Sequence, residues 1–390
     1  TNGGYVFAYW SNSVGGLNQA NPLTFAATTN LAFTAWFASN YFPGVAGNYY
    51  GLFYPTNPGS IISPANSGFY TLSVKSNAGF SLSLSFPGAS NAFSGTFPLY
   101  VSDPSGYAHA EFSWKGLDGQ PVTNIVNLDM TNGTYSLNGT VANAKFSSAL
   151  NGFRAATRLT AGSAVIPGTN VFLIPGDTNA SNNLPGGNSY GALTLGTNGA
   201  ISLVGRLADN TPFSQGAFVS TNFNMTNGIW PFYASLYSGQ GIILGWQTWQ
   251  TAAAPANFEG WVAWSKPARG GAYYTNAFLA YTNSYAAGYV RPAEGSYQIE
   301  FGGASLTNGL ANTLKAGTNG LFIVEPGQAN NLTLTNNAAS GAVSGSFSFP
   351  TAKTAHNFYG AFVSPALGGS GYFLDTNSQT GWFVITRIAP

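Results

Sequence analysis

The chain contains no cysteine and very little charge. Without cysteine it can form neither disulfide bridges nor thiolate metal sites. Charged residues make up 6% of its 390 residues, whereas they make up about 25% of a typical globular protein. The 12 basic residues are scattered singly, so they cannot neutralise the phosphates of a nucleic acid or hold the chain on an anionic membrane. We therefore expect no nucleic-acid partner.

Long apolar runs are also missing. None reaches the roughly 18 residues of a transmembrane helix, so we expect no insertion into a membrane. The strands of an outer-membrane barrel run about ten residues with an unbroken lipid-facing row. The apolar segments here are shorter and interrupted by serine and proline, which disfavours that alternative. The start, Thr1 to Gly4, has no basic region typical of a signal peptide, so if the protein is exported we expect position 1 to be the mature start.

What the chain does contain is apolar and aromatic: 44% of the residues are hydrophobic and 15% are aromatic. Asparagine, threonine, serine, glycine and glutamine must then cover most of the surface. Net charge normally keeps chains apart, and this chain has a net charge of only +1. Such a surface tolerates crowding and self-association, which suits a coat or a polymer.

The dominant pattern has a period of two residues, which is typical of strands with one buried face. Asn-Gly dipeptides recur between these segments and favour tight hairpin turns. We predict an all-β chain of two duplicated antiparallel β-barrel or β-sandwich domains with almost no helix. The alternating apolar positions include Leu72, Val74, Phe80, Leu82, Leu84, Phe86, Leu193, Leu195, Ile201 and Leu203.

An internal repeat divides the chain. Residues 67–97 parallel residues 188–218, and residues 330–362 form a third, looser copy. The alternation breaks near 158–165, where we expect a boundary. We predict a strand-bearing segment over 1–44, a first β-domain over 45–160, and a second, larger β-domain over 161–390 that contains two of the copies.

Several stretches carry a family resemblance. GNYYGLFYP, SGFYTLSV, GAISLVGRLADNTPFSQ, WPFYASLYSGQGIILGW and SGSFSFP resemble the exported β-strand repeat modules of environmental Gram-negative bacteria. The resemblance covers roughly 45–390. It implies export and a β-fold, but it implies no activity.

One possible nucleophile stands in GNSYG at 187–191, which matches the G-x-S-x-G pattern of a nucleophile elbow. That motif needs a strand before it and a helix after it. Here Pro-Gly-Gly precedes Ser189 and an apparent strand follows. His109 and His356 are the only histidines, and neither has a recognisable catalytic context. We predict that Ser189 lies in a turn.

The sequence evidence for a metal site or for a catalytic pair of carboxylates is equally weak. DTNAS at 177–181 resembles the first half of a calcium loop, but Asn182 and Asn188 stand where glycine and glutamate are needed. A glycosidase needs two carboxylates facing one cleft. We expect solvated or turn-capping carboxylates instead, and we predict no enzyme, no metal and no cofactor. The carboxylates nearest in sequence are Glu111, Asp118 and Asp129, and Glu294 and Glu300.

Residues 227–250 form an uncharged aromatic stretch, which we predict to be a hairpin of 229–237 and 242–250 over SGQG. One face, with Trp230 and Phe232 on the first strand and Ile242, Leu244 and Trp246 on the second, is expected in the core. The other face could be covered by core packing, by a subunit contact or by a sugar. Three of its residues form a possible aromatic contact surface: Tyr233, Tyr237 and Trp249.

The N-terminal GYVFAYW lies outside the repeats and is apolar on both faces of a strand. Such a strand must be covered on both sides. It is either the first strand of its own domain or a strand donated to the sheet edge of a neighbouring subunit. The residues of this predicted assembly strand are Tyr5, Val6, Phe7, Tyr9 and Trp10.

Together these observations favour an exported structural protein, extracellular or on the cell surface, whose partners are other copies of itself in a filament or surface layer. The alternative is a secreted carbohydrate-binding module whose partners are surface glycans. A glycoside-active enzyme is the third and least favoured hypothesis.

Overall fold

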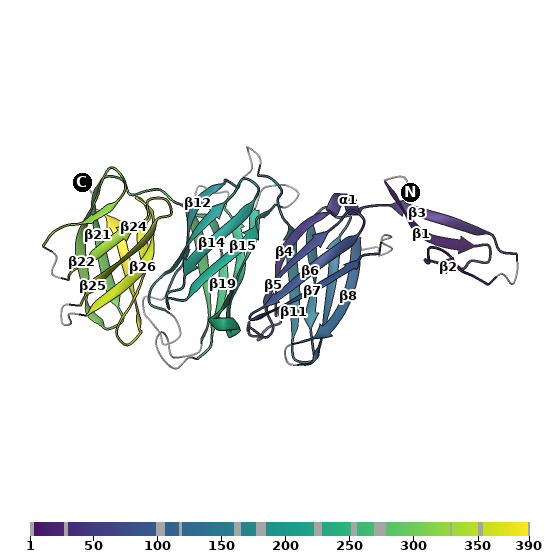
Figure 1. Cartoon of the computed structure of the whole chain (residues 1–390), viewed down its shortest axis with the longest axis horizontal. Helices are drawn as coiled ribbons and strands as arrows, with labels where there is room; N and C mark the ends of the chain where they lie inside the picture. The colour runs from purple at the N-terminus through teal and green to yellow at the C-terminus, as the bar shows by residue number, and fades with distance from the viewer. Residues whose placement is uncertain are drawn as a thin grey trace.

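The computed structural model describes residues 4–26, 30–98, 106–116, 119–159, 165–176, 185–221, 228–250, 256–268, 278–327, 330–349 and 354–388. A small N-terminal sheet, which we call the arm, is followed by three curled antiparallel sheets in a row, which we call barrels 1, 2 and 3 (Figure 1). The all-β class and the near absence of helix are confirmed. No helix among these described residues is long and apolar enough to span a membrane.

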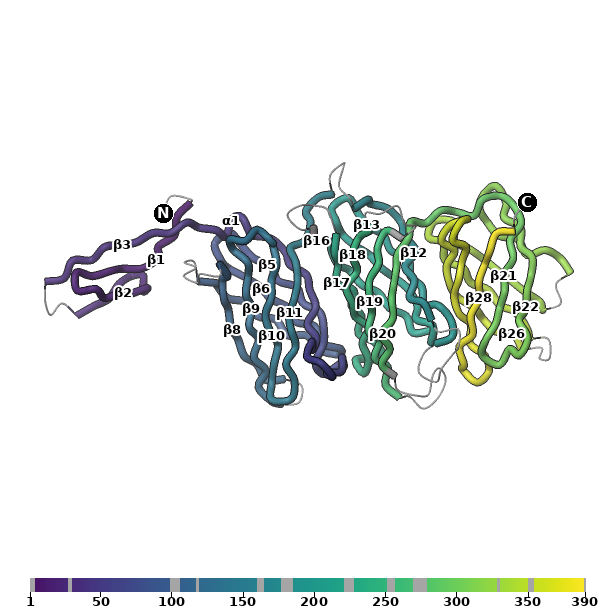
Figure 2. The backbone as a smooth tube through the Cα atoms, turned by 180° about the vertical axis from the view of Figure 1, so that it is seen from behind, coloured from purple at the N-terminus to yellow at the C-terminus, as the bar shows by residue number. Residues whose placement is uncertain are grey.

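The arm is a three-stranded sheet with the order β2-β1-β3. It projects from barrel 1 on the side away from barrel 2 (Figures 1 and 2). A single helical turn links it to barrel 1. The elements are β1 (Tyr5–Asn12), β2 (Leu17–Asn18), β3 (Phe33–Ser39) and α1 (Phe42–Val45).

Barrel 1 is an eight-stranded meander in which the first strand, β4, pairs with the last, β11. The sheet edges, β7 and β8, meet at a seam. Aromatic rings close this seam: Phe93 lies 5.1 Å from both Phe112 and Trp114, measured between ring centroids. The strands are β4 (Gly47–Tyr54), β5 (Gly68–Val74), β6 (Gly79–Phe86), β7 (Ala89–Thr96), β8 (Tyr107–Lys115), β9 (Pro121–Asp129), β10 (Ser136–Ala142) and β11 (Ser147–Arg154).

Barrel 2 repeats this plan, with β12 paired to β20. A polar side chain bridges its seam: Gln215 of β15 donates to the Pro231 carbonyl of β17 (2.7 Å) and accepts from the Tyr233 N–H (3.1 Å). The elements are β12 (Gly168–Ile174), β13 (Ser189–Leu195), β14 (Ala200–Arg206), β15 (Pro212–Phe218), β16 (Ser220–Thr221), β17 (Gly228–Leu236), the 3-10 turn η1 (Tyr237–Gly239), β18 (Gly241–Trp249), β19 (Ala256–Lys266) and β20 (Phe278–Gly288).

Barrel 3 pairs β21 with β28, and its seam separates two short strands, β23 and β24. Asn336 of β24 accepts from the Phe322 N–H and donates to the Gly320 carbonyl, both at 2.8 Å. The strands are β21 (Gly295–Gly303), β22 (Leu306–Ala316), β23 (Phe322–Val324), β24 (Thr333–Asn336), β25 (Ala342–Ser348), β26 (Ala355–Ser364), β27 (Gly368–Leu374) and β28 (Thr380–Arg387).

The sheets divide the chain more finely than the sequence suggested. The described part of the range 161–390, expected as one larger domain, forms two separate sheets, so the described residues form three large sheets where two domains were expected. The first two repeat copies occupy the second to fourth strands of barrels 1 and 2. The looser third copy occupies β24–β26, the fourth to sixth strands of barrel 3. Its offset explains why the sequence did not reveal a third barrel.

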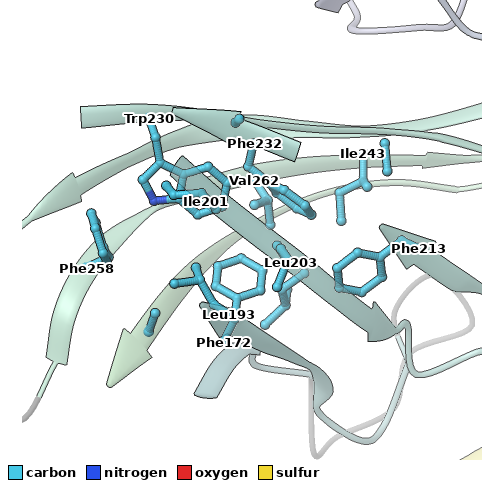
Figure 3. Packing of buried hydrophobic residues seen from close by; sticks show 14 of the residues in the cluster. Phe172, Leu193, Ile201, Leu203, Phe213, Trp230, Phe232, Ile243, Phe258 and Val262 are labelled. Carbon is cyan, nitrogen blue, oxygen red and sulfur yellow. The ribbon is translucent and has the colours of Figure 1, made fainter. Parts of the chain in front are cut away.

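Each barrel buries its own apolar interior. In barrel 2, rings from β12, β15 and β17 converge with aliphatic side chains of β13 and β14 (Figure 3). Trp230 and Phe232 lie there as predicted. For the second strand of that hairpin the prediction is wrong, because Ile243 and Trp249 face the interior. The three residues expected there, Ile242, Leu244 and Trp246, face outward. Adjacent apolar residues on β18 give no alternation, so the sequence did not fix which face turns inward.

Candidate functional site

Most of the exposed aromatic side chains among the described residues lie in the arm and its link to barrel 1. Tyr5 is 57%, Trp36 49% and Phe37 54% exposed. Rings pair across the strands, with Tyr9 stacked on Trp36 (5.9 Å between centroids) and Phe7 edge-on to Phe37 (6.1 Å). Because successive strand residues point to opposite sides, Phe37 and Trp36 lie on different faces, and both faces of the sheet expose an aromatic ring.

The arm also has open backbone edges. β1 pairs with β3 along its whole length, but within the described residues it pairs with β2 only at Trp10 and Ser11. The stretch Tyr5 to Tyr9 is thus paired on one side. β3 forms the opposite edge of the sheet. Unpaired strand edges are templates for adding another strand.

The structure places the predicted assembly strand in this arm. Val6 is buried, Tyr5 is exposed, and Phe7, Tyr9 and Trp10 are half-buried. Within one chain the strand pairs with its own β2 and β3, so its donation to a neighbour stays a prediction. Sequence analysis missed Trp36 and Phe37, although FTAWFAS at 33–39 shows a similar apolar pattern.

The three residues of the possible aromatic contact surface do not lie together. Tyr233 lies between barrels 1 and 2, where its ring stacks on Phe69 at 5.7 Å. Tyr237 and Trp249 lie instead in the interior of barrel 2. The backbone of Tyr237 is in the left-handed region (φ +52°), which breaks the alternation of the strand and turns this ring inward.

The outward face of β17–β19 packs on the outward face of β4, β5 and β11. Leu52 of barrel 1 is fully buried against Ile242 and Leu244 of barrel 2. Aromatic pairs surround this contact: Tyr54 with Trp261 at 5.4 Å, Phe153 with Trp246 at 5.8 Å, and Tyr50 with Phe218 at 5.2 Å.

Barrel 2 packs on barrel 3 through the corresponding strands. Val171 and Leu173 of β12 are buried with Ala361 and Val363 of β26. Tyr372 donates a hydrogen bond to the Asn210 side chain (2.9 Å). The first strand of one barrel thus docks near the sixth strand of the next at both junctions.

The two outermost faces of the row are mainly polar. On barrel 1, His109, Asn127 and Asn138 form a hydrogen-bonded row across β8, β9 and β10, with contacts of 2.9 and 3.1 Å. On barrel 3 the outward side chains of β21, β22 and β28 include Gln298, Glu300, Thr313, Lys315 and Thr386. Terminal units of stacked arrays carry such polar outer faces.

The hydrolase motif has a structural explanation. Ser189 is buried at the start of β13, and its hydroxyl accepts a hydrogen bond from the Ala208 N–H (2.9 Å). His109 lies on barrel 1 and His356 in barrel 3, so neither belongs to the barrel that contains this serine. The strand β13 begins at Ser189 itself and pairs there with Ile174, so the prediction that this serine lies in a turn is wrong.

The candidate carboxylates are dispersed. Asp129 caps a turn by accepting from the backbone of Thr131, Asn132 and Thr134, and Glu111 is exposed on β8. Glu300 lies on the outer face of β21. Asp118 and the candidate calcium loop at 177–181 lie outside the described residues. Within the described ranges, no three histidine, aspartate or glutamate side chains gather as a metal site.

One cavity opens at an end of barrel 1. Its volume is about 310 Å³. Trp114, Phe86 and Phe146 supply an apolar wall, and Asn91 and Lys145 add polar groups. The fully buried amide of Asn124, on β9 two residues beyond the lining Val122, has no hydrogen-bond partner among the described residues.

Comparisons with known proteins add little. No family model and no curated protein sequence matches the chain. A solved structure of transferrin binding protein B from Haemophilus parasuis is similar, with a TM-score of 0.21 and 9% identity, over 87% of this chain and 75% of that one. Intact Ap-TbpB has a TM-score of 0.21 and 9% identity, over 97% and 84%.

A protein of unknown function from Nostoc punctiforme has a TM-score of 0.18 and 11% identity, over 64% of this chain and 97% of that one. At such scores and identities these likenesses carry no argument about what the chain does.

Proposed function

We propose that the chain is an exported structural protein of the cell surface that assembles with copies of itself through the arm. The observation that carries the proposal is the half-paired stretch Tyr5 to Tyr9, in a sheet that exposes aromatic rings on both faces, Phe37 on one and Trp36 on the other. The low charge of the whole chain and its resemblance to exported modules support the location.

Another copy of the chain is the occupant that fits best. The free end faces of barrels 1 and 3 are mainly polar, so the apolar surface of the arm finds its best match in a second arm. Burying each aromatic ring would contribute roughly 1.5–3 kcal/mol, and the backbone edges would add hydrogen bonds and register. An arm with two open edges can pair with two others, and a contact that does not close on itself extends into a filament or layer.

The test is the assembly state of the full chain with Phe37 replaced by serine, measured by sedimentation velocity and electron microscopy. We expect the unaltered chain to form species larger than a monomer and the Phe37→Ser chain to dissociate more readily. Ile323→Ser is the matched control, because Ile323 is 62% exposed on β23 of barrel 3 and lies outside the arm. Equal assembly of the Phe37→Ser and unaltered chains, or of a chain lacking residues 1–40, would contradict the proposal.

A second candidate is glycan binding at the mouth of barrel 1. The cavity there combines aromatic faces with amide and ammonium groups, a mixture suited to sugars because rings can stack on their apolar faces. Trp114→Ala should abolish retention on a glycan array if this function is present. Retention unchanged by Trp114→Ala would remove the cavity from consideration.

A further inference from the structure

Barrel 2 buries an ion pair in its interior. The ammonium of Lys266, at the end of β19, lies 3.3 Å from Oδ2 of Asp209, in the turn between β14 and β15, and both side chains are 1% exposed. Leu207, Leu236 and Trp264 of the same apolar cluster are buried around this end of the barrel. Removing two charges from water costs several kcal/mol per ion, which mutual attraction does not always offset.

Neighbouring groups hold the carboxylate in one orientation. The Tyr237 hydroxyl donates to Oδ2 at 2.7 Å, and the Trp264 indole N–H donates to the Tyr237 oxygen at 3.0 Å. The Thr211 N–H donates to the other oxygen, Oδ1, at 3.0 Å. The two carboxylate oxygens therefore have different partners: Oδ2 faces the phenol and the ammonium, and Oδ1 accepts from the Thr211 N–H.

The backbone at this point is unusual. Tyr237 and Ser238 are consecutive non-glycine residues in the left-handed region, at φ +52° and +56°. Such conformations cost about 1–3 kcal/mol each and persist where the surroundings enforce them, often at functional sites. Here they bring the phenol onto the carboxylate.

We propose that Lys266 and Asp209 join spontaneously in an intramolecular isopeptide bond. A proton passes from the ammonium to Oδ2 across their 3.3 Å contact, which leaves a neutral amine and a neutral carboxyl group. The neutral amine is a nucleophile, held beside the carboxyl carbon by the fold. Its nitrogen forms a bond to that carbon, the bond from the carbon to Oδ2 breaks, and a second proton from the nitrogen leaves with Oδ2 as water.

The partners of the carboxylate match the two roles that this step requires. Oδ1 stays as the amide oxygen, and the Thr211 N–H stabilises the negative charge that develops on it. Oδ2 is the leaving oxygen, and the Tyr237 hydroxyl assists its departure by hydrogen bonding. The step consumes one ammonium and one carboxylate and yields one amide and one water, without an oxidant or co-reactant. The proposal does not depend on whether the chain self-assembles.

Mass spectrometry of the denatured full chain tests the bond. We expect a mass lower than that of the sequence by one water, and a branched peptide that contains both Asp209 and Lys266 after proteolysis. Lys266→Arg keeps a cation beside Asp209 but cannot form the amide, so this variant should have its full sequence mass. Tyr237→Phe should lower the linked fraction, whereas Tyr49→Phe, which removes a buried phenol from barrel 1, should leave it unchanged.

The full sequence mass in the unaltered, folded protein would overturn the proposal. So would a lost water that maps to a single linear peptide, as ring closure between Asp209 and the next residue would give. If Tyr237→Phe cross-links as completely as the unaltered chain, the role assigned to the phenol is wrong.

Discussion

Barrels 1 and 2 have the same strand plan, but the outward face of β8–β10 in barrel 1 is free, whereas the outward face of β17–β19 in barrel 2 is buried. A cross-strand row in barrel 1 reads Glu111, Ile125 and Thr140. A row in the same three strands of barrel 2 reads Tyr233, Leu244 and Ala263. The first face ends the row of barrels, and the second is buried against barrel 1. The outward-facing side chains of a strand therefore determine whether its barrel packs on another barrel. The inward-facing side chains form the core on which folding depends.

The largest expected difference between the two faces is at Leu244. We expect Leu244→Ala to lower the free energy of unfolding by about 2–5 kcal/mol, since it leaves a cavity in a fully buried contact. Ile125→Ala, at the central position of the barrel 1 row, should cost less than about 1 kcal/mol because that face is free. Chemical denaturation of both variants measures the difference. Equal losses would show that the face between the barrels contributes no special stability.

Alkaline pH should weaken the docked faces. Burial raises the pKa of Tyr54, Tyr190 and Tyr233 in these faces above the ordinary value of about 10. A raised folded-state pKa means that stability is complete below the unfolded-state value and is lost as the pH rises through the folded-state value. Denaturation midpoints should therefore be flat to about pH 9 and fall above about pH 10. Tyr233→Phe should reduce this loss, and Tyr281→Phe, at an exposed site, should not.

Changing the free face to resemble the docked one tests the comparison from the other side. Glu111→Tyr combined with Thr140→Val would give barrel 1 an apolar row. We expect weak self-association, with a Kd between about 1 μM and 1 mM, or roughly 4–8 kcal/mol. Sedimentation at several concentrations measures it. Strictly unchanged behaviour would mean that a single row is not enough to create a docking face.

The smallest effect is expected for the Tyr233 hydroxyl. This oxygen is buried without a hydrogen-bond partner among the described residues, so Tyr233→Phe at neutral pH should be neutral or stabilising by up to about 1 kcal/mol. Thermal denaturation at pH 7 checks this. A clear loss of stability would reveal a partner for the hydroxyl, for example an ordered water.

The sequence predicted the β-class because single-faced strands alternate clearly. Leu72, Leu82 and Leu84 all lie in the interior of barrel 1, as their spacing indicated. Prediction failed where both faces of a strand are buried, as at Ile242 to Leu244, since no polar residue marks the outer face. It also could not connect Asp209 with Lys266, because only the closure of the sheet brings β19 beside the β14–β15 turn.

The pairing of first and last strands has a mechanical consequence. In each barrel the chain enters and leaves at one corner, as the partners Tyr49 and Arg154, Asn170 and Gly288, and Tyr297 and Arg387 show. Tension between the ends of a barrel therefore pulls on one ladder from its end. Antiparallel hydrogen bonds loaded in this way break in succession, like a zipper, and do not share the load as they would in shear. Under tension such a row would lengthen as its barrels unfold one after another, and each unfolded barrel would add its extended chain to the total length.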